Sequence, residues 1–309
     1  MQLIRVAVLL FALLFVAAGC GSAPGAAAPA TAGVTLKDDA GRQVTIAKPP
    51  ERIISLAPST TEIVFALGAG QRVIAVDAFS DYPEQAKSLP KVTQGANYNY
   101  EQIVSLKPDL VLAAGITSPE VIKKLEDLKL TVLVVGAPSQ SFASAESDIE
   151  LAGKALGAEQ LAGQVTQDME KKIADVKTAV ANAKDKPKVY WELDATDPSK
   201  PYAPGTGSFL DDLISLAGGE NVTASAGQAY SQVNAEEIIK ANPDVIILSD
   251  AAYGTTPDSV KSRPGWNVIK AVQNDRVLPI DDNLVSRPGP RLADGLEAAA
   301  RLIHPELFH

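Results

Sequence analysis

Two glutamates, Glu101 and Glu236, stand in one short pattern that occurs twice in the chain, 135 residues apart. In each copy an asparagine precedes the glutamate by two residues, and a later Pro-Asp pair opens an apolar stretch. Asparagine is a good helix N-cap, and a carboxylate in the first helical turn is stabilised by the helix dipole. Capping alone accepts aspartate or serine as readily, so the repeated residue type favours a shared role and predicts two lobes of like construction. The repeated pairs are Asn99/Asn234, Glu101/Glu236, Ile103/Ile238, Pro108/Pro243 and Asp109/Asp244.

No catalytic arrangement stands out in the sequence: acids are plentiful, but no pair of them is singled out by spacing. The only histidines, His304 and His309, fall in the last six residues, where we expect a mobile or surface position, which argues against a Ser-His-Asp or Cys-His arrangement. We expect no zinc or manganese site, because histidine is the usual nitrogen ligand of these metals. The stretch 205–208 (GTGS) could hold an anion, but N-capping by Ser208 is favoured. The sequence therefore indicates a protein that is not an enzyme and needs no cofactor.

The first 33 residues are typical of a targeting segment and an anchor. A lone cation, Arg5, precedes a thirteen-residue apolar run, which is too short to span a bilayer and fits a secretory signal. Small residues then lead to Cys20, as in the lipobox of bacterial lipoproteins; an ordinary cleaved signal is the alternative. We predict a lipoprotein signal peptide over 1–19, lipidation at Cys20 and a flexible tether over 20–33. The protein would then be extracytoplasmic and anchored to the cell membrane.

The composition limits the core and the partners. The mature chain would have 290 residues, enough for two domains of ordinary size. It would carry 37 acidic against 27 basic side chains, which argues against nucleic acid, whose phosphates need a basic face. A single cysteine allows no intramolecular disulfide, so the core must form by packing alone.

Short runs rich in Val, Ile and Leu alternate with helical patterns in both halves of the chain, which predicts α/β lobes whose parallel sheets are covered on both faces. In the first half the predicted strands are 52–57, 72–77, 109–113 and 131–136, and the helices are 60–67, 100–106 and 119–128. In the second half the strands are 189–193, 244–249 and 276–280, and the helices are 208–216, 235–241 and 291–303.

The segment between the halves predicts one long helix from Ala158 to Ala183. Its apolar residues recur at intervals of three and four and would lie on one helix face: Leu161, Val165, Met169, Ile173, Val176 and Val180. At 1.5 Å per residue the helix would be about 40 Å long, comparable to the diameter of a small domain. We favour a rigid connector over one more surface helix of a single domain. The predicted parts are an amino-terminal lobe (34–140), a connecting helical segment (141–186) and a carboxy-terminal lobe (187–309).

Ligands of open α/β sheets bind beyond the carboxyl ends of the strands, so we expect a ligand cleft between the two lobes. The few aromatic residues fall in or near loops, where large rings supply contact area for a ligand; packing beneath the loops is the alternative. Arg287 lies in a rigid Pro-Gly-Pro loop and is favoured over Arg291, which we assign to the last helix. The predicted ligand-binding residues are Ser59, Thr60, Phe79, Tyr82, Tyr98, Trp191, Tyr202, Tyr230, Tyr253 and Arg287.

The chain resembles a known family from about Val34 to its carboxy terminus. The resemblance rests on the stretches 52–68 (RIISLAPSTTEIVFALG), 80–83 (SDYP), 100–112 (YEQIVSLKPDLVL), 218–221 (GGEN) and 234–248. These resemble the helical-backbone (class III) substrate-binding proteins of ABC importers for vitamin B12, haem and ferric siderophores. The resemblance implies two α/β lobes joined by one long helix, with little hinge motion. It also implies that a glutamate of each lobe docks to arginines of the membrane permease dimer, and Glu101 and Glu236 occupy those positions.

The resemblance favours a corrinoid ligand over a ferric siderophore or haem. The motif 80–83 is most similar to that of the cobalamin binders, in which aromatic residues near the positions of Phe79 and Tyr230 wedge against the corrin ring. The chain departs from that group at Gly95 and Tyr230, where tryptophan is usual. A catecholate siderophore would need a more basic pocket than this acidic chain shows around Arg287.

Haem would need Tyr98, Tyr100 or Tyr230 as a ligand of its iron. An extracellular hydrolase would need a catalytic set, and an adhesive lipoprotein would not need aromatic residues grouped in loops. We therefore expect a monomeric binding protein that delivers a corrinoid or ferric chelate to an ABC importer.

Overall fold

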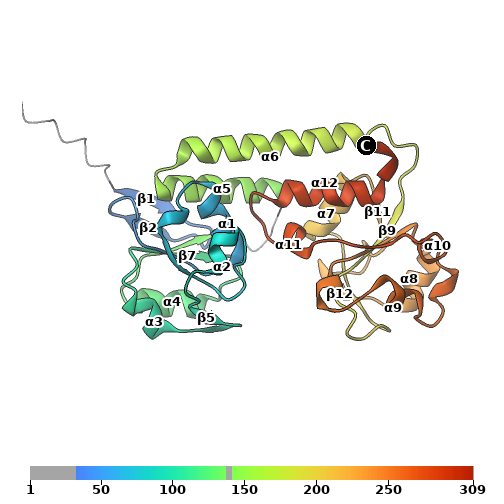
Figure 1. Ribbon diagram of the computed structural model, residues 1–309, viewed down its shortest axis with the longest axis horizontal. Helices are drawn as coiled ribbons and strands as arrows, with labels where there is room; N and C mark the ends of the chain where they lie inside the picture. Colours follow the sequence, from blue (N-terminus) through green and yellow to red (C-terminus); the bar gives the residue numbers. More distant parts are fainter. Residues whose placement is uncertain (1–32, 137–140, 309) are drawn as a thin grey trace, which may run out of the picture. The chain divides into compact units, whose positions relative to one another are not determined.

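The computed structural model describes residues 33–136 and 141–308. The predicted signal peptide, Cys20, the tether up to residue 32 and His309 lie outside these residues. In the described part of the chain no helix is long and apolar enough to cross a membrane. Figure 1 shows two α/β lobes and, along one side of both, the long helix α6 (Glu159–Val180).

The amino-terminal lobe is built on a parallel sheet, as predicted, and its strand order is β4-β3-β7-β8. The strands are β3 (Ile53–Ser55), β4 (Val73–Val76), β7 (Leu110–Ala114) and β8 (Val132–Val135), and the helices are α1 (Pro58–Ala66), α2 (Glu84–Lys87), α3 (Tyr100–Ser105) and α4 (Pro119–Asp127). Two small antiparallel hairpins were not predicted: β1 (Val34–Lys37) with β2 (Gln43–Ile46), and β5 (Thr93–Gln94) with β6 (Asn97–Tyr98). These strands are too short to give a clear sequence pattern.

The carboxy-terminal lobe repeats the plan with a parallel sheet in the order β11-β9-β13-β14. The strands are β9 (Lys188–Glu192), β11 (Glu220–Asn221), β13 (Val245–Leu248) and β14 (Val277–Pro279), and an antiparallel ribbon pairs β10 (Tyr202–Pro204) with β12 (Tyr230–Gln232). The helices are α7 (Phe209–Leu216), α8 (Ala235–Ala241), α9 (Pro257–Lys261), α10 (Lys270–Gln273), α11 (Asp282–Val285) and α12 (Leu292–Ile303). The predicted strands and helices of both lobes are confirmed to within two residues at each end.

One hydrophobic cluster runs through both lobes. Successive strand residues point to opposite faces of a sheet, so Leu110 and Val245 belong to this shared cluster, whereas their neighbours Val111 and Ile246 belong to separate clusters on the other faces. The shared cluster is completed by α1, α5 (Phe142–Leu156), α6, α7 and α12. Helix α6 packs on α5 of one lobe and on α12 of the other, which explains how it connects them.

The buried face of α6 differs slightly from the predicted one. Met169, Ile173 and Val176 are buried as expected, but Leu161 is 42% exposed and the neighbouring Ala162 is buried instead. The reason is close packing against α5: an added Cβ at Gly153 of α5 would stand only 2.6 Å from the Cβ of Ala162 on α6. Two small residues thus let the helices approach closely where a leucine would not fit. The boundaries at residues 140 and 186 stay predictions.

The repeated asparagines cap equivalent helices. The Asn99 side chain accepts a hydrogen bond from the backbone N–H of Gln102 at 3.0 Å, at the start of α3. Asn234 accepts one from the N–H of Glu236 at 2.9 Å, at the start of α8. Both helices lie on the sheet face opposite to the shared cluster, and each buries its repeated isoleucine there. The predicted likeness of the two lobes therefore extends to these helices.

The repeated aspartates join neighbouring strands. Asp109 accepts hydrogen bonds from the backbone N–H groups of Glu51 and Arg52, both at 2.9 Å, just before β3. Asp244 accepts one from the N–H of Lys188 at 2.9 Å, at the start of β9. The asparagine and the aspartate of each copy thus have structural roles, whereas the glutamate side chains are exposed.

Two acids, Asp39 in the turn between β1 and β2 and Asp148 in α5, interact directly. Burial, the charge of Asp39 and a hydrogen bond with it raise the pKa of Asp148 from 3.8 to about 7. Between about pH 4 and 7 Asp148 is protonated in the folded protein but ionised in the unfolded chain. The contribution of Asp148 to the free energy of unfolding therefore falls as the pH rises from about 4 to 7, and it is constant above about pH 7. We expect Asp148→Asn to raise the melting temperature at pH 8, because an amide can donate to Asp39 without a charge. Calorimetry from pH 4 to 8 measures this; Glu150→Gln, exposed on the same helix, is the control, and equal shifts of Asp148→Asn at pH 4 and 8 would contradict the assignment.

Candidate functional site

Phe79 and Tyr82 lie in the loop 77–83 that follows β4, and their side chains are exposed. The loop is held from within: the N–H of Phe79 donates to Asp77 Oδ1 at 2.7 Å, and Lys91 Nζ donates to the carbonyl of Ser80 at 2.7 Å. An aromatic ring that is 61% exposed on a loop so well anchored is available for contact with a ligand.

Tyr202 and Tyr230 share one face of the ribbon β10–β12. Tyr202 stands opposite Gln232, and Tyr230 stands opposite Pro204, so the two tyrosines are diagonal neighbours on one face. Such neighbours lie about 7–8 Å apart, within reach of aromatic side chains. The other face of the ribbon buries Ala203 in the core of the lobe. Both rings are exposed, and they form one aromatic surface that the sequence did not reveal.

The phenol of Tyr230 has a polar anchor. Burial raises its pKa, against hydrogen bonds from the backbone of Phe209 and Leu210 at the start of α7, which lower it. Tyr253, on the turn after β13, is 83% exposed and stands apart from the ribbon in sequence.

Three predicted ligand residues are engaged by the protein itself. Trp191 is fully buried on the shared-cluster face of β9, and its Nε1 donates to Ser249 Oγ at 2.7 Å, so it is a core residue. Thr60 is buried at the start of α1, and its hydroxyl bonds Ser55 Oγ at 2.7 Å and donates to the carbonyl of Ala57 at 3.0 Å. Ser59 is also buried.

Arg287 does not extend towards open solvent as a ligand contact would. Its side chain is 12% exposed, and its guanidinium donates to Asp81 Oδ1 at 2.6 Å and to Glu62 Oε1 at 3.3 Å. Arg291, assigned only to the last helix, directly precedes α12 and forms a bidentate pair with the same Glu62 at 2.8 and 2.6 Å. The structure does not distinguish Arg287 from Arg291 as a ligand contact, because both side chains pair with residues of the amino-terminal lobe.

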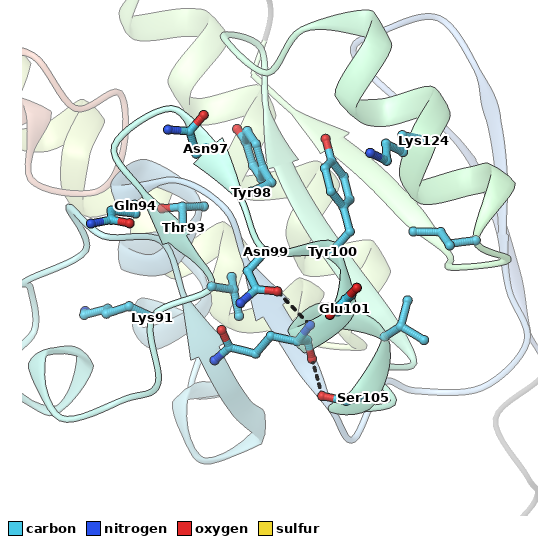
Figure 2. Close-up of a pocket in the computed structure, with 14 residues that line it drawn as sticks. Lys91, Thr93, Gln94, Asn97, Tyr98, Asn99, Tyr100, Glu101, Ser105 and Lys124 are labelled. Carbon is cyan, nitrogen blue, oxygen red and sulfur yellow. Dashed lines mark hydrogen bonds between the residues drawn. The ribbon is translucent and has the colours of Figure 1, made fainter.

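Tyr98 and Glu101 lie in the same part of the amino-terminal lobe. Both line a groove of about 1070 Å³ formed by α3, α4 and the hairpin β5–β6. Figure 2 shows Tyr98 and Tyr100 on either side of Asn99 with their hydroxyls pointing the same way; their ring centroids are 6.1 Å apart, and Lys124 Nζ lies 4.1 Å from the centroid of Tyr100. Glu101 therefore opens onto a polar and aromatic surface.

Two buried polar atoms follow the central strands of the two sheets. Thr117 Oγ1, after β7, and Asp250 Oδ1, after β13, have no hydrogen-bond partner among the described residues. Burial raises the pKa of Asp250, although a hydrogen bond from Thr255 opposes the shift. Both atoms lie near the carboxyl ends of strands, where open α/β sheets bind their ligands.

Sequence reasoning missed the Glu62 network and misplaced a histidine. Glu62 is the only charged residue of α1 and directly precedes its apolar residues Ile63 and Val64, and a buried acid there requires a cationic partner, which is a signal that could have been used. His304 is buried rather than at the surface, because its Nε2 lies 3.2 Å from the carbonyl of Gly218 and its Nδ1 lies 3.2 Å from Glu306.

Comparison with known proteins identifies the family. A family model described as periplasmic binding protein matches residues 53–284. An uncharacterized ABC transporter substrate-binding lipoprotein of Bacillus subtilis, YvrC, is 38% identical over 279 residues, which cover 89% of this chain and 87% of that protein. The vitamin B12-binding protein of Vibrio cholerae is 32% identical over 251 residues, 81% of this chain and 87% of that protein.

A solved structure agrees with the sequence relatives. The periplasmic haem-binding protein RhuT from Roseiflexus sp. RS-1 matches with a TM-score of 0.74 at 28% identity, over 83% of this chain and 99% of that chain. The fold of two parallel-sheet lobes connected by one long helix is thus similar to that of the Roseiflexus protein. The chain belongs to the periplasmic binding protein family, and within it to the substrate-binding proteins of ABC transporters for vitamin B12, haem and siderophore ligands.

Proposed function

We propose that this protein captures a corrinoid of the vitamin B12 type between its lobes and delivers it, as a monomer, to the permease of an ABC importer. The observation that carries the proposal is the pair Tyr202 and Tyr230 on one face of the ribbon β10–β12, together with the exposed Phe79 of the other lobe. A corrin ring is a large, flat ligand, and aromatic side chains give it contact area at low entropic cost. The 32% identity to a vitamin B12-binding protein supports this choice of ligand.

Haem is the second candidate. Tyr230 is half exposed, and its phenol oxygen could ligate haem iron by exchanging the backbone hydrogen bonds from Phe209 and Leu210 for the metal. The TM-score of 0.74 with a haem-binding protein supports it as well.

Gel filtration decides between the ligands. The purified protein is incubated with cyanocobalamin, with haemin or with a ferric catecholate chelate, and the visible absorbance of the protein peak is recorded. Co-elution of cyanocobalamin is the expected result. If only haemin or only the chelate co-elutes, that compound and not a corrinoid is the ligand. If none of the three co-elutes, the proposed function is overturned.

We expect Phe79→Ala and Tyr230→Ala each to weaken cyanocobalamin binding by about tenfold or more, as for aromatic contacts at the centre of an interface. Absorbance titration at equilibrium measures the dissociation constants. Val268→Ala removes an exposed apolar side chain from the turn before α10 and is the control. Unchanged affinity in both aromatic variants would show that the ligand binds elsewhere.

Docking and anchoring complete the proposal. Glu101 and Glu236 would pair with arginines of a two-fold symmetric permease, one glutamate from each lobe, because carboxylate–arginine pairs fix orientation as well as adding energy. Their exposure at the starts of α3 and α8 supports this role. Lipidation of Cys20 would hold the protein at the membrane, in keeping with the lipoprotein name of the Bacillus relative.

A further inference from the structure

Two arginines of the carboxy-terminal lobe hold the loop 77–83 of the amino-terminal lobe. Arg287 Nη2 donates to the backbone carbonyl of Phe79 at 3.3 Å, and its Nη1 donates to Asp81 Oδ1 at 2.6 Å. The guanidinium of Arg291 lies 3.8 Å from the ring centroid of Tyr82. One lobe therefore contacts the other at three residues of the same short loop.

Both arginines converge on one buried carboxylate. The side chain of Glu62 is 2% exposed and accepts hydrogen bonds from Arg291 Nε and Nη2 and from Arg287 Nη1. An uncompensated charge at such a site is strongly unfavourable, so each guanidinium is fixed by the carboxylate that it neutralises. Glu62 belongs to α1, which follows directly after β3 of the amino-terminal sheet. The arginines that bind Glu62 are therefore held at a fixed position relative to that sheet.

The segment that carries the arginines is itself rigid. Two prolines, Pro288 and Pro290, restrict its backbone, and a Cβ at Gly289 would stand 3.6 Å from the carbonyl oxygen of Ser59. Arg291 directly precedes α12, which packs against α6. A continuous path of packed elements thus leads from α6 through α12 to the loop that bears Phe79.

We propose that Arg287 is a positioning residue for ligand capture: by holding the carbonyl of Phe79 and the carboxylate of Asp81, it fixes the ring of Phe79 before the ligand arrives. This inference rests on the proposed function. A loop that is already ordered loses less conformational entropy when the ligand binds. Restraint of the loop by Arg287 therefore increases the affinity for the ligand. Because the guanidinium is occupied by groups of the amino-terminal lobe, Arg287 acts through the loop and not on the ligand.

The test combines hydrogen–deuterium exchange with binding. In Arg287→Ala without ligand, the amides of residues 78–82 are expected to exchange faster, while those of β13 keep their rates. Cyanocobalamin is expected to bind about tenfold more weakly, and Arg287→Lys is expected to recover part of the loss. The control is Arg301→Ala, which removes an exposed Arg–Glu pair on α12.

A double-mutant cycle separates positioning from direct contact. If Arg287 acts through Phe79, its replacement costs much less affinity in the F79A background. An equal cost in both backgrounds, unchanged exchange in the loop, or faster exchange with unchanged affinity would each overturn the inference. If cyanocobalamin does not bind the unaltered protein, the proposed function fails for that ligand, whereas the exchange rates still decide whether Arg287 orders the loop.

Discussion

A protein in which Glu101 and Glu236 are both replaced by arginine is expected to bind its ligand with unchanged affinity and to support no import. The two side chains are exposed at the starts of equivalent helices, so the substitutions leave the core intact. Each new arginine would face an arginine of the permease, so that two attractive contacts would become repulsive. Uptake of labelled cyanocobalamin into vesicles that contain the cognate permease measures the effect, and a binding titration is run in parallel.

Charge reversal needs a matched control, because it changes the net charge of the protein by four. Glu120 and Glu159 are likewise exposed side chains in the first turns of α4 and α6, and replacing both by arginine makes the same change in charge. Import is expected to persist in this control. Import that survives reversal of Glu101 and Glu236 would refute the docking role, whereas recovery on reversing the permease arginines to glutamate would establish it.

The largest loss of stability is expected from Glu192→Gln. Glu192 is fully buried at the end of β9, where it accepts two hydrogen bonds from Arg263 at 2.6 and 2.7 Å and one from the Tyr190 hydroxyl at 3.0 Å. The amide would leave the guanidinium of Arg263, which is 8% exposed, without the carboxylate with which it forms its salt bridge. Breaking a buried pair in this way costs about 3–5 kcal/mol in free energy of unfolding.

Urea denaturation followed by tryptophan fluorescence measures this loss, since Trp191 and Trp266 are both buried in this lobe. Glu297→Gln breaks a pair with Arg301 on the surface of α12, and exposed pairs contribute at most about 1 kcal/mol. Equal losses in the two variants would show that burial of the Glu192 pair adds nothing to its strength.

The sequence was a reliable guide wherever local pattern decides structure. The strands 109–113 and 244–249 were predicted because continuous runs of Val, Ile and Leu are typical of strands buried on both faces. The helix from Ala158 was predicted because its apolar residues recur at intervals of three and four. The family of the chain was identified for a similar reason, since its motifs are continuous stretches of sequence.

Contacts between residues far apart in the chain could not be predicted from the sequence. Glu62 and Arg287 are 225 residues apart, and only the docked lobes bring them together. The same holds for Trp191, whose place in a loop or in the core depends on which face of β9 meets the shared cluster. The diagonal placement of Tyr202 and Tyr230 on one face required the register of a ribbon whose strands have three residues each.

The hydrophobic cluster that runs through both lobes makes the fold tolerant of a broken chain. A cut in the turn between α6 and β9 would separate the lobes covalently, yet α6 of the first fragment would still be packed on α12 of the second. The two fragments would then behave as the subunits of a heterodimer, with an interface that is a protein core divided in two. Each fragment alone would expose that apolar surface to water, so the halves should reassemble when mixed and fail to fold when kept apart.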